Sequence, residues 1–105
     1  MTAQPSPLYL SLLGETARIS WTELQPFFAR GALLQVAGEL DLVAVAVALA
    51  EDDRGRVAGW LEAGLLAEVT ALQAEDLLLR DPELWAVVVA PWVVIQERSG
   101  KPQLH

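Results

Sequence analysis

A run of apolar residues extends from Trp85 to Ile95 and is interrupted only by Pro91. Its valines, isoleucine and tryptophans favour extended backbone, because branched and aromatic side chains pack well on a pleated sheet. An apolar run without alternation is typical of a strand that is covered on both faces. The pattern predicts one long strand, Trp85–Glu97, at the centre of the fold. It should bulge or bend at Pro91, which has no amide hydrogen to donate.

Two shorter apolar segments, Ala32–Ala37 and Leu65–Val69, are predicted as further strands. The segments between the three strands are long enough to contain helices. At least one pair of strands is therefore expected to be parallel, with a right-handed crossover. The sequence thus predicts an α+β fold, with a small three-stranded mixed sheet and helices packed mainly on one face.

Two helices are predicted before the first of these strands. Leu8–Arg18 carries leucines at helical spacing, although Gly14 weakens such a helix by about 1 kcal/mol relative to alanine. Ser20 and Glu23 then have the spacing of a capping box, in which each side chain accepts a hydrogen bond from a backbone amide. Pro26 lies too deep for the first turn of this second helix, so we expect a kink or two short pieces.

The segment Leu42–Ala50 is compatible with two structures. Its valines alternate with alanines, which is a strand pattern. Its high alanine content favours a buried helix, and Asp41 is a suitable residue to cap the start of one. We expect the helix.

Two further helices are predicted in the second half of the chain. The first is Arg54–Ala63, which ends at Gly64. The second begins after Thr70, where Gln73 repeats the capping-box spacing, and continues to Arg80. The residues that this last helix is expected to bury are Leu72, Ala74, Leu77 and Leu78.

The composition indicates one small domain with a large apolar content. Hydrophobic residues make up 53% of 105 residues, so most of them must be buried or covered by a partner. We expect a single domain over residues 1–105, with an ordered core at about 8–98 and loose tails at 1–7 and 99–105. No membrane span or export signal is recognised, which predicts the cytoplasm. The net charge of −7, without a basic cluster, argues against nucleic-acid binding.

The densest acidic group is Glu51, Asp52 and Asp53. Carboxylates are the ligands that Mg²⁺ and Ca²⁺ prefer. However, no calcium-loop pattern surrounds these residues, and neighbours along one turn seldom converge on one ion. A solvated turn that caps the next helix explains them better, and no metal site is predicted.

Four polar residues flank strongly apolar segments: Glu23, Arg30, Gln96 and Glu97. A carboxylate–guanidinium pair beside a cleft could bind a small anion or polarise a substrate. A salt bridge between the second helix and the end of the long strand is the simpler interpretation and the one we favour. Glu23, Arg30 and Gln96 remain the candidate ligand-binding residues.

The residues needed for familiar catalytic chemistry are missing. The chain has no cysteine, and its one histidine is the last residue, His105. No Ser–His or Cys–His arrangement can therefore form inside the domain. No glycine-rich phosphate loop occurs either. These observations argue against an enzyme and predict no catalytic residue and no cofactor.

Four tryptophans, at positions 21, 60, 85 and 92, are many for a chain of this length. Such side chains are more often core than surface, but those that remain uncovered can anchor an interface. Trp85 and Trp92 are the candidate interface residues.

Several segments together resemble a bacterial family, the domain of unknown function 2288. They include Trp21–Pro26, Leu40–Val43, Glu51–Asp53 and, most specifically, Leu84–Gln96. The resemblance covers roughly Glu15 to Glu97. Two positions depart from the pattern: Phe27 stands where a histidine is expected, and Leu77 where an aromatic residue is expected. The resemblance implies a small, bacterial, cytoplasmic protein and supplies no activity.

The sequence favours a non-catalytic interaction or regulatory module. Such a module would associate with itself as a homo-oligomer or dock on another cytoplasmic protein. The alternative is a small-ligand or metal-binding domain that uses Glu23, Arg30 and nearby carboxylates. A third and weaker hypothesis is an enzyme that works with a pair of carboxylates.

Overall fold

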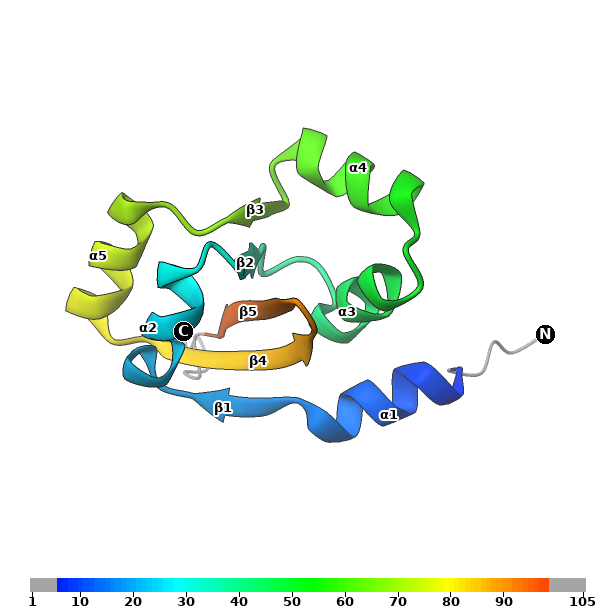
Figure 1. The fold of residues 1–105 in the computed structure, drawn as a ribbon, viewed down its shortest axis with the longest axis horizontal. Helices are drawn as coiled ribbons and strands as arrows, with labels where there is room; N and C mark the ends of the chain where they lie inside the picture. Colours follow the sequence, from blue (N-terminus) through cyan, green and yellow to red (C-terminus); the bar gives the residue numbers. More distant parts are fainter. Residues whose placement is uncertain (1–5, 99–105) are drawn as a thin grey trace, which may run out of the picture.

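The structure is a computed structural model that describes residues 6–98. The elements in chain order (Figure 1) are α1 (Pro7–Glu15), β1 (Ala17–Ile19), α2 (Trp21–Ala29), β2 (Leu33–Val36), α3 (Leu42–Ala50), α4 (Arg54–Ala63), β3 (Leu66–Glu68), α5 (Ala71–Arg80), β4 (Glu83–Val89) and β5 (Trp92–Arg98). The loose tails that we predicted lie outside the described residues, except for Ser6 and Pro7, which begin α1.

The α+β class is confirmed, whereas the predicted three-stranded sheet is wrong. The sheet has five strands in the order β1-β4-β5-β2-β3. β2 and β5 are parallel, as expected for at least one pair, and the other neighbours are antiparallel. β5 is the central strand, so part of the C-terminal apolar run does lie at the centre of the sheet.

The long strand predicted for Trp85–Glu97 is wrong, because the segment forms a hairpin. Val89 pairs with Trp92, which leaves Ala90 and Pro91 as a two-residue turn. The peptide bond between these two residues is cis. A proline cannot donate to the ladder, and here the chain reverses at that point instead of bulging and continuing.

β1, which follows α1, is a strand that the sequence did not predict. We expected a helix over Leu8–Arg18, but α1 ends at Glu15 and β1 pairs with the start of β4. The amide of Thr16 donates to the carbonyl of Leu13, and its hydroxyl donates to that of Leu12. These bonds close the helix, and the chain then extends along the edge of the sheet.

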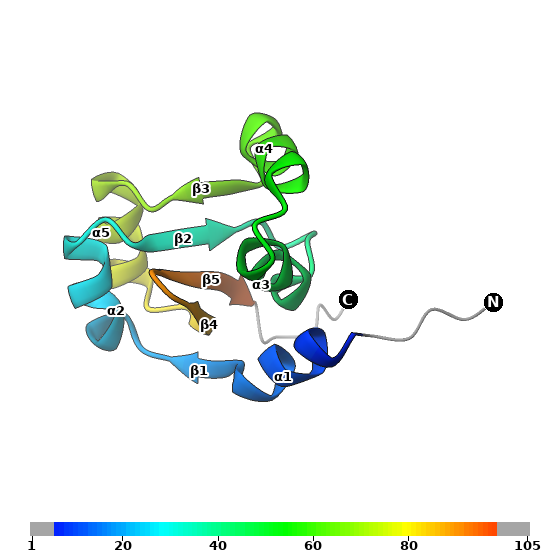
Figure 2. The same cartoon turned by 45° about the vertical axis from the view of Figure 1, so that its right-hand side comes forward.

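Helices cover both faces of the sheet, so the expectation that they pack mainly on one face is wrong. α1, α3 and α4 contribute side chains to one hydrophobic cluster, and α2 and α5 contribute to a second. Adjacent strand residues such as Leu33 and Leu34, or Val93 and Val94, belong to different clusters. Figures 1 and 2 show α2 and α5 to the left of the strands and α3 and α4 to the right. Below, the α3 face and the α5 face denote the two sides of the sheet.

The local signals for helix starts are confirmed. Ser20 with Glu23 and Thr70 with Gln73 form capping boxes at the starts of α2 and α5. Asp41 caps α3, accepting from the amides two and three residues further on at 2.9 and 3.3 Å. The ambiguous segment Leu42–Ala50 is therefore a helix, as expected, and it is buried along most of its length.

Each of the five described helices has nine or ten residues. α2 is a single helix that contains Pro26, so it does not divide into two short pieces. The backbone position that loses its donor is exposed to water, which can satisfy the carbonyl left unpaired. Within residues 6–98, no helix is long and apolar enough to cross a membrane.

Candidate functional site

The three candidate ligand-binding residues do not lie together. Glu23 is at the start of α2, where its carboxylate faces the Ser20 amide at 3.5 Å. Arg30 follows the end of the same helix, and its guanidinium lies 4.8 Å from the centre of the Phe27 ring. Gln96 points to the α3 face of the sheet, whereas α2 packs on the α5 face. No common pocket joins these residues in the described part of the chain.

Gln96 has a structural position in the core. The residue is 4% exposed, and its side-chain amide donates to the carbonyls of Ala37 and Leu40, at 2.8 and 2.7 Å. These carbonyls belong to the turn between β2 and α3. Gln96 therefore fastens the end of β5 to this turn.

Glu97 forms its salt bridge with α5, not with the second helix as we predicted. Arg80, the last residue of α5, donates to both carboxylate oxygens of Glu97, at 2.7 and 3.0 Å. It also donates to Asp76, with a shortest distance of 2.7 Å. One guanidinium thus connects two carboxylates and ties α5 to β5.

The hydrogen bonds between Arg80, Asp76 and Glu97 shift the pKa of each of these three groups. Hydrogen bonds from Arg80 lower the pKa of Asp76 and of Glu97 below the usual carboxyl range. Hydrogen bonds to Glu97 and then Asp76 raise the pKa of Arg80 further above its already high value. All three groups therefore remain charged near neutral pH.

Replacing Arg80 with methionine is expected to lower stability at pH 7 and to flatten its acid dependence. A carboxyl pKa that is lower in the folded chain adds stability above the unfolded pKa, near 4. That stability is lost as the pH falls through the folded pKa. The measurement is the urea midpoint of both proteins between pH 7 and pH 2. Parallel profiles would show that the network contributes nothing to the acid response.

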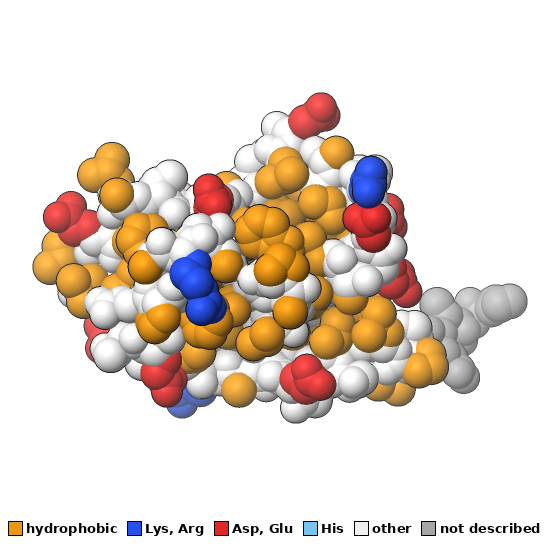
Figure 3. Space-filling model, viewed as in Figure 1, with side chains coloured by type: hydrophobic (Ala, Val, Ile, Leu, Met, Phe, Trp, Pro, Cys, Tyr) orange, Lys and Arg blue, Asp and Glu red, His pale blue; other side chains and the backbone are white. Residues whose placement is uncertain are grey.

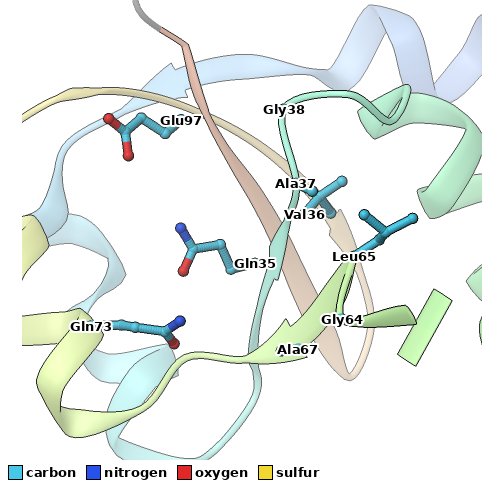
Figure 4. A pocket seen from close by; sticks show the side chains of 9 residues that line it. All are labelled: Gln35, Val36, Ala37, Gly38, Gly64, Leu65, Ala67, Gln73 and Glu97. Carbon is cyan, nitrogen blue, oxygen red and sulfur yellow. The ribbon is translucent and has the colours of Figure 1, made fainter. Parts of the chain in front are cut away.

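Glu97 of this network also lines a pocket of about 430 Å³ on the α5 face (Figure 4). β2 and β5 run in the same direction, so their C-terminal ends meet at one edge of the sheet. Ligands often bind where parallel strands end in this way. The walls include Gly38 and Gly64, which have no side chain, and Ala67, whose side chain is a single methyl group, so the space stays open.

Three polar side chains enter this pocket from three elements: Gln35 from β2, Gln73 from α5 and Glu97 from β5. Figure 4 shows their polar ends directed toward the same space. The Oε1 atom of Gln35 is buried and accepts no hydrogen bond from residues 6–98. Gln73 uses its own Oε1 to accept from the Thr70 amide at 3.0 Å, which leaves its amide hydrogens for another partner.

Sequence reasoning did not find Gln35 or Gln73 as site residues. One signal was available, because Gln35 interrupts an otherwise apolar strand and so places an amide where a core residue is expected. Gln73 carried no separate signal, since the capping box already explained it.

The two candidate interface tryptophans are half-buried and pack against the cluster on the α3 face. Trp85 donates to Glu83 at 3.2 Å, and the Arg98 guanidinium lies 5.1 Å from its ring centre. Trp92 lines a smaller cavity of about 230 Å³ beside Val57 and Leu61 of α4. Their role as interface residues stays a prediction.

The acidic turn has the capping arrangement that we favoured. Asp53 caps α4 by accepting from the Arg56 amide at 3.3 Å, and Asp52 pairs with Arg54 at 3.2 Å. Within the described range, no three histidine, aspartate or glutamate side chains are grouped as metal ligands.

Large apolar side chains are exposed on α5. The prediction that Leu72 and Leu78 are buried is wrong, because they are 79% and 55% exposed. Leu79 is also 79% exposed, whereas Ala74 and Leu77 are buried, as predicted. Along the left edge of Figure 3, over α5, apolar side chains lie on either side of an acidic one. Only the inner side of α5 is buried in the core, so the leucines on its other sides remain exposed.

Comparisons with known proteins found one solved structure and one family model that match this chain. A solution NMR structure of PA1075 from Pseudomonas aeruginosa is 68% identical and has a TM-score of 0.81. The match covers 100% of this chain and 97% of that one. No curated protein matches the chain. The family described as protein of unknown function (DUF2288) matches residues 7–97. The chain belongs to this bacterial family, DUF2288.

Proposed function

We propose that the protein is a non-catalytic interaction module of the bacterial cytoplasm. It docks through the outer surface of α5 on a basic amphipathic helix of another protein. The observation that carries this proposal is the 79% exposure of both Leu72 and Leu79. The outer surface of α5 is defined here as Leu72, Glu75, Asp76 and Leu79, together with Leu78 at its side.

The outer surface has a spacing that suits helix packing. Residues 72, 75, 76 and 79 follow the i, i+3, i+4, i+7 pattern, so they form one stripe along α5. A helix at the protein surface normally presents polar residues on the side that faces water. Leucines at both ends of the stripe give a partner helix two apolar contacts, and the ridges and grooves between them fit a second helix.

Charge favours a basic partner over a second copy of this chain. If two α5 helices packed antiparallel, Leu72 would meet Leu79 of the other copy, and Glu75 would meet Asp76. Four carboxylates would then gather at the centre of the contact. The positive charge of Arg80 would reduce this repulsion only a little, because Arg80 already bridges Asp76 and Glu97 of its own chain. A net charge of −7 adds further repulsion between copies.

The first test is solution mass by light scattering over a wide range of protein concentration. We expect a monomer throughout, because the acidic middle of the outer surface opposes pairing with itself. A dimer that is lost on changing Leu72 and Leu79 to glutamine would assign this surface to self-association and overturn the choice of a foreign partner.

The second test places a photoreactive amino acid at position 72 and illuminates the protein in bacterial lysate. Leu61 of α4 is 50% exposed and provides the matched control position. We expect a cross-link from position 72 to a lysine- or arginine-rich segment, absent from position 61, and reduced by about tenfold or more when Leu79→Gln is added. Equal cross-linking from both positions, or to an acidic segment, would refute the proposal.

A further inference from the structure

We infer that the pocket between the ends of β2 and β5 binds a small organic cation with an ammonium or guanidinium group. The inference does not rest on the docking function proposed above. Leu72 and Leu79 do not line this pocket, and Gln35 and Glu97 are not on the outer surface of α5. Each proposal can therefore fail alone.

Hydrogen-bond acceptors converge in the pocket. Gln35 offers an Oε1 atom that is buried and has no donor among residues 6–98. A buried acceptor without a donor costs stability, and native chains retain few of them. Glu97 adds a carboxylate whose orientation is fixed by its two bonds to Arg80. Each carboxylate oxygen can accept a further bond, so a ligand rich in N–H groups would satisfy both residues.

The charge around the pocket is negative. Asp76 and Glu97 share the single guanidinium of Arg80, which leaves this group with one uncompensated negative charge. No lysine or arginine is among the described residues that line the pocket. An anionic ligand would therefore meet repulsion, and a cation would meet attraction.

The volume of the pocket limits the size of the ligand, and Gln73 indicates a second polar group that the ligand can carry. A volume of about 430 Å³ is at the small end for ligand pockets. The Gln73 amide group can donate to a carbonyl or hydroxyl oxygen, because only its oxygen is used in the capping box. The pocket thus suits a short amine or guanidine that carries an uncharged polar group at some distance from the cation.

The test is an NMR titration of the isotope-labelled full chain with 4-amino-1-butanol, a short amine that carries an ammonium group at one end and a hydroxyl group at the other. We expect saturable shifts of the Gly38 and Gly64 backbone amides and of the side-chain amides of Gln35 and Gln73. The uncharged 1,4-butanediol should leave these signals unmoved. Shifts spread over the acidic surface without saturation would overturn the inference.

Two variants and a control make the test specific to the pocket. Gln35→Leu should weaken the binding of 4-amino-1-butanol at least tenfold without lowering the melting temperature, because it removes an unpaired acceptor. Glu97→Gln should also weaken it. Glu83 is likewise paired with an arginine, at 3.3 Å, but lines a different pocket. Glu83→Gln should leave the affinity unchanged. If Glu83→Gln weakens the binding of 4-amino-1-butanol as much as Glu97→Gln does, general attraction to an acidic chain explains the binding and the inference is wrong.

Discussion

Replacing Gln96 with leucine is expected to lower the free energy of unfolding by about 2–3 kcal/mol. The amide of Gln96 supplies hydrogen bonds to the carbonyls of Ala37 and Leu40 in the interior. The Ala37 carbonyl would keep the bond from the Leu40 amide, at 3.1 Å. The Leu40 carbonyl would be left without a donor among residues 6–98. The measurement is urea unfolding at pH 7, followed by tryptophan fluorescence.

Gln35→Leu is the matched control for this prediction. It makes the same chemical change in the adjacent strand, but it removes a buried acceptor that has no partner in the described chain. We expect its stability to be unchanged or about 1 kcal/mol higher. If both variants lose the same free energy of unfolding, the cause is the replacement of an amide by an apolar side chain and not the two hydrogen bonds of Gln96.

Leu77→Ala is expected to lower the free energy of unfolding by about 3 kcal/mol, within the usual range of 2–5 kcal/mol for such cavities. Leu77 is 1% exposed and packs in the cluster on the α5 face. With Ala74, it forms the buried side of α5. Hydrogen exchange of the α5 amides should rise together with the loss of global stability, because the helix loses much of its buried apolar contact with this cluster.

Leu79→Ala is the control on the same helix, with the same change in helix propensity. It should alter stability by less than about 0.5 kcal/mol, because 79% of this side chain is already in water. A loss comparable to that of Leu77→Ala would show that the outer surface of α5 is covered in solution. In that case the proposed docking surface would not be available to a foreign partner.

Local chemistry explains why much of the fold could be predicted. Capping residues act within one turn, so Ser20, Asp41 and Thr70 marked the starts of α2, α3 and α5 whatever the tertiary structure. β1 gave no such signal, because three residues are too few to show a pattern. The hairpin was missed because its turn is Ala90-Pro91, without the glycine or asparagine that usually marks one.

The two-sided sheet could have been predicted from the sequence. The absence of alternation between Trp85 and Ile95 indicated strands covered on both faces, which requires helices on both sides. The burial of both Leu33 and Leu34 in β2 repeats the same pattern. Helices packed mainly on one face are incompatible with a central strand that is apolar on both faces.

The candidate site depended on tertiary positions that a sequence does not give. Glu23, Arg30 and Gln96 are spread over a helix start, a helix end and the opposite face of the sheet. The pocket groups Gln35 with Glu97, more than sixty positions away in the chain, because β2 and β5 are parallel neighbours. Only the register of the sheet brings these two residues together.

The central position of β5 has a consequence for synthesis of the chain. β5 joins the β1–β4 pair to the β2–β3 pair, and no other ladder within residues 6–98 joins the two pairs. It is the last element of the described chain, so the ribosome makes it after all the others. Until it emerges, β2 has an unpaired edge that can recruit another strand, since exposed edges promote association. The edge of β2 therefore stays open to pairing with other chains until β5 has been made and has joined the sheet.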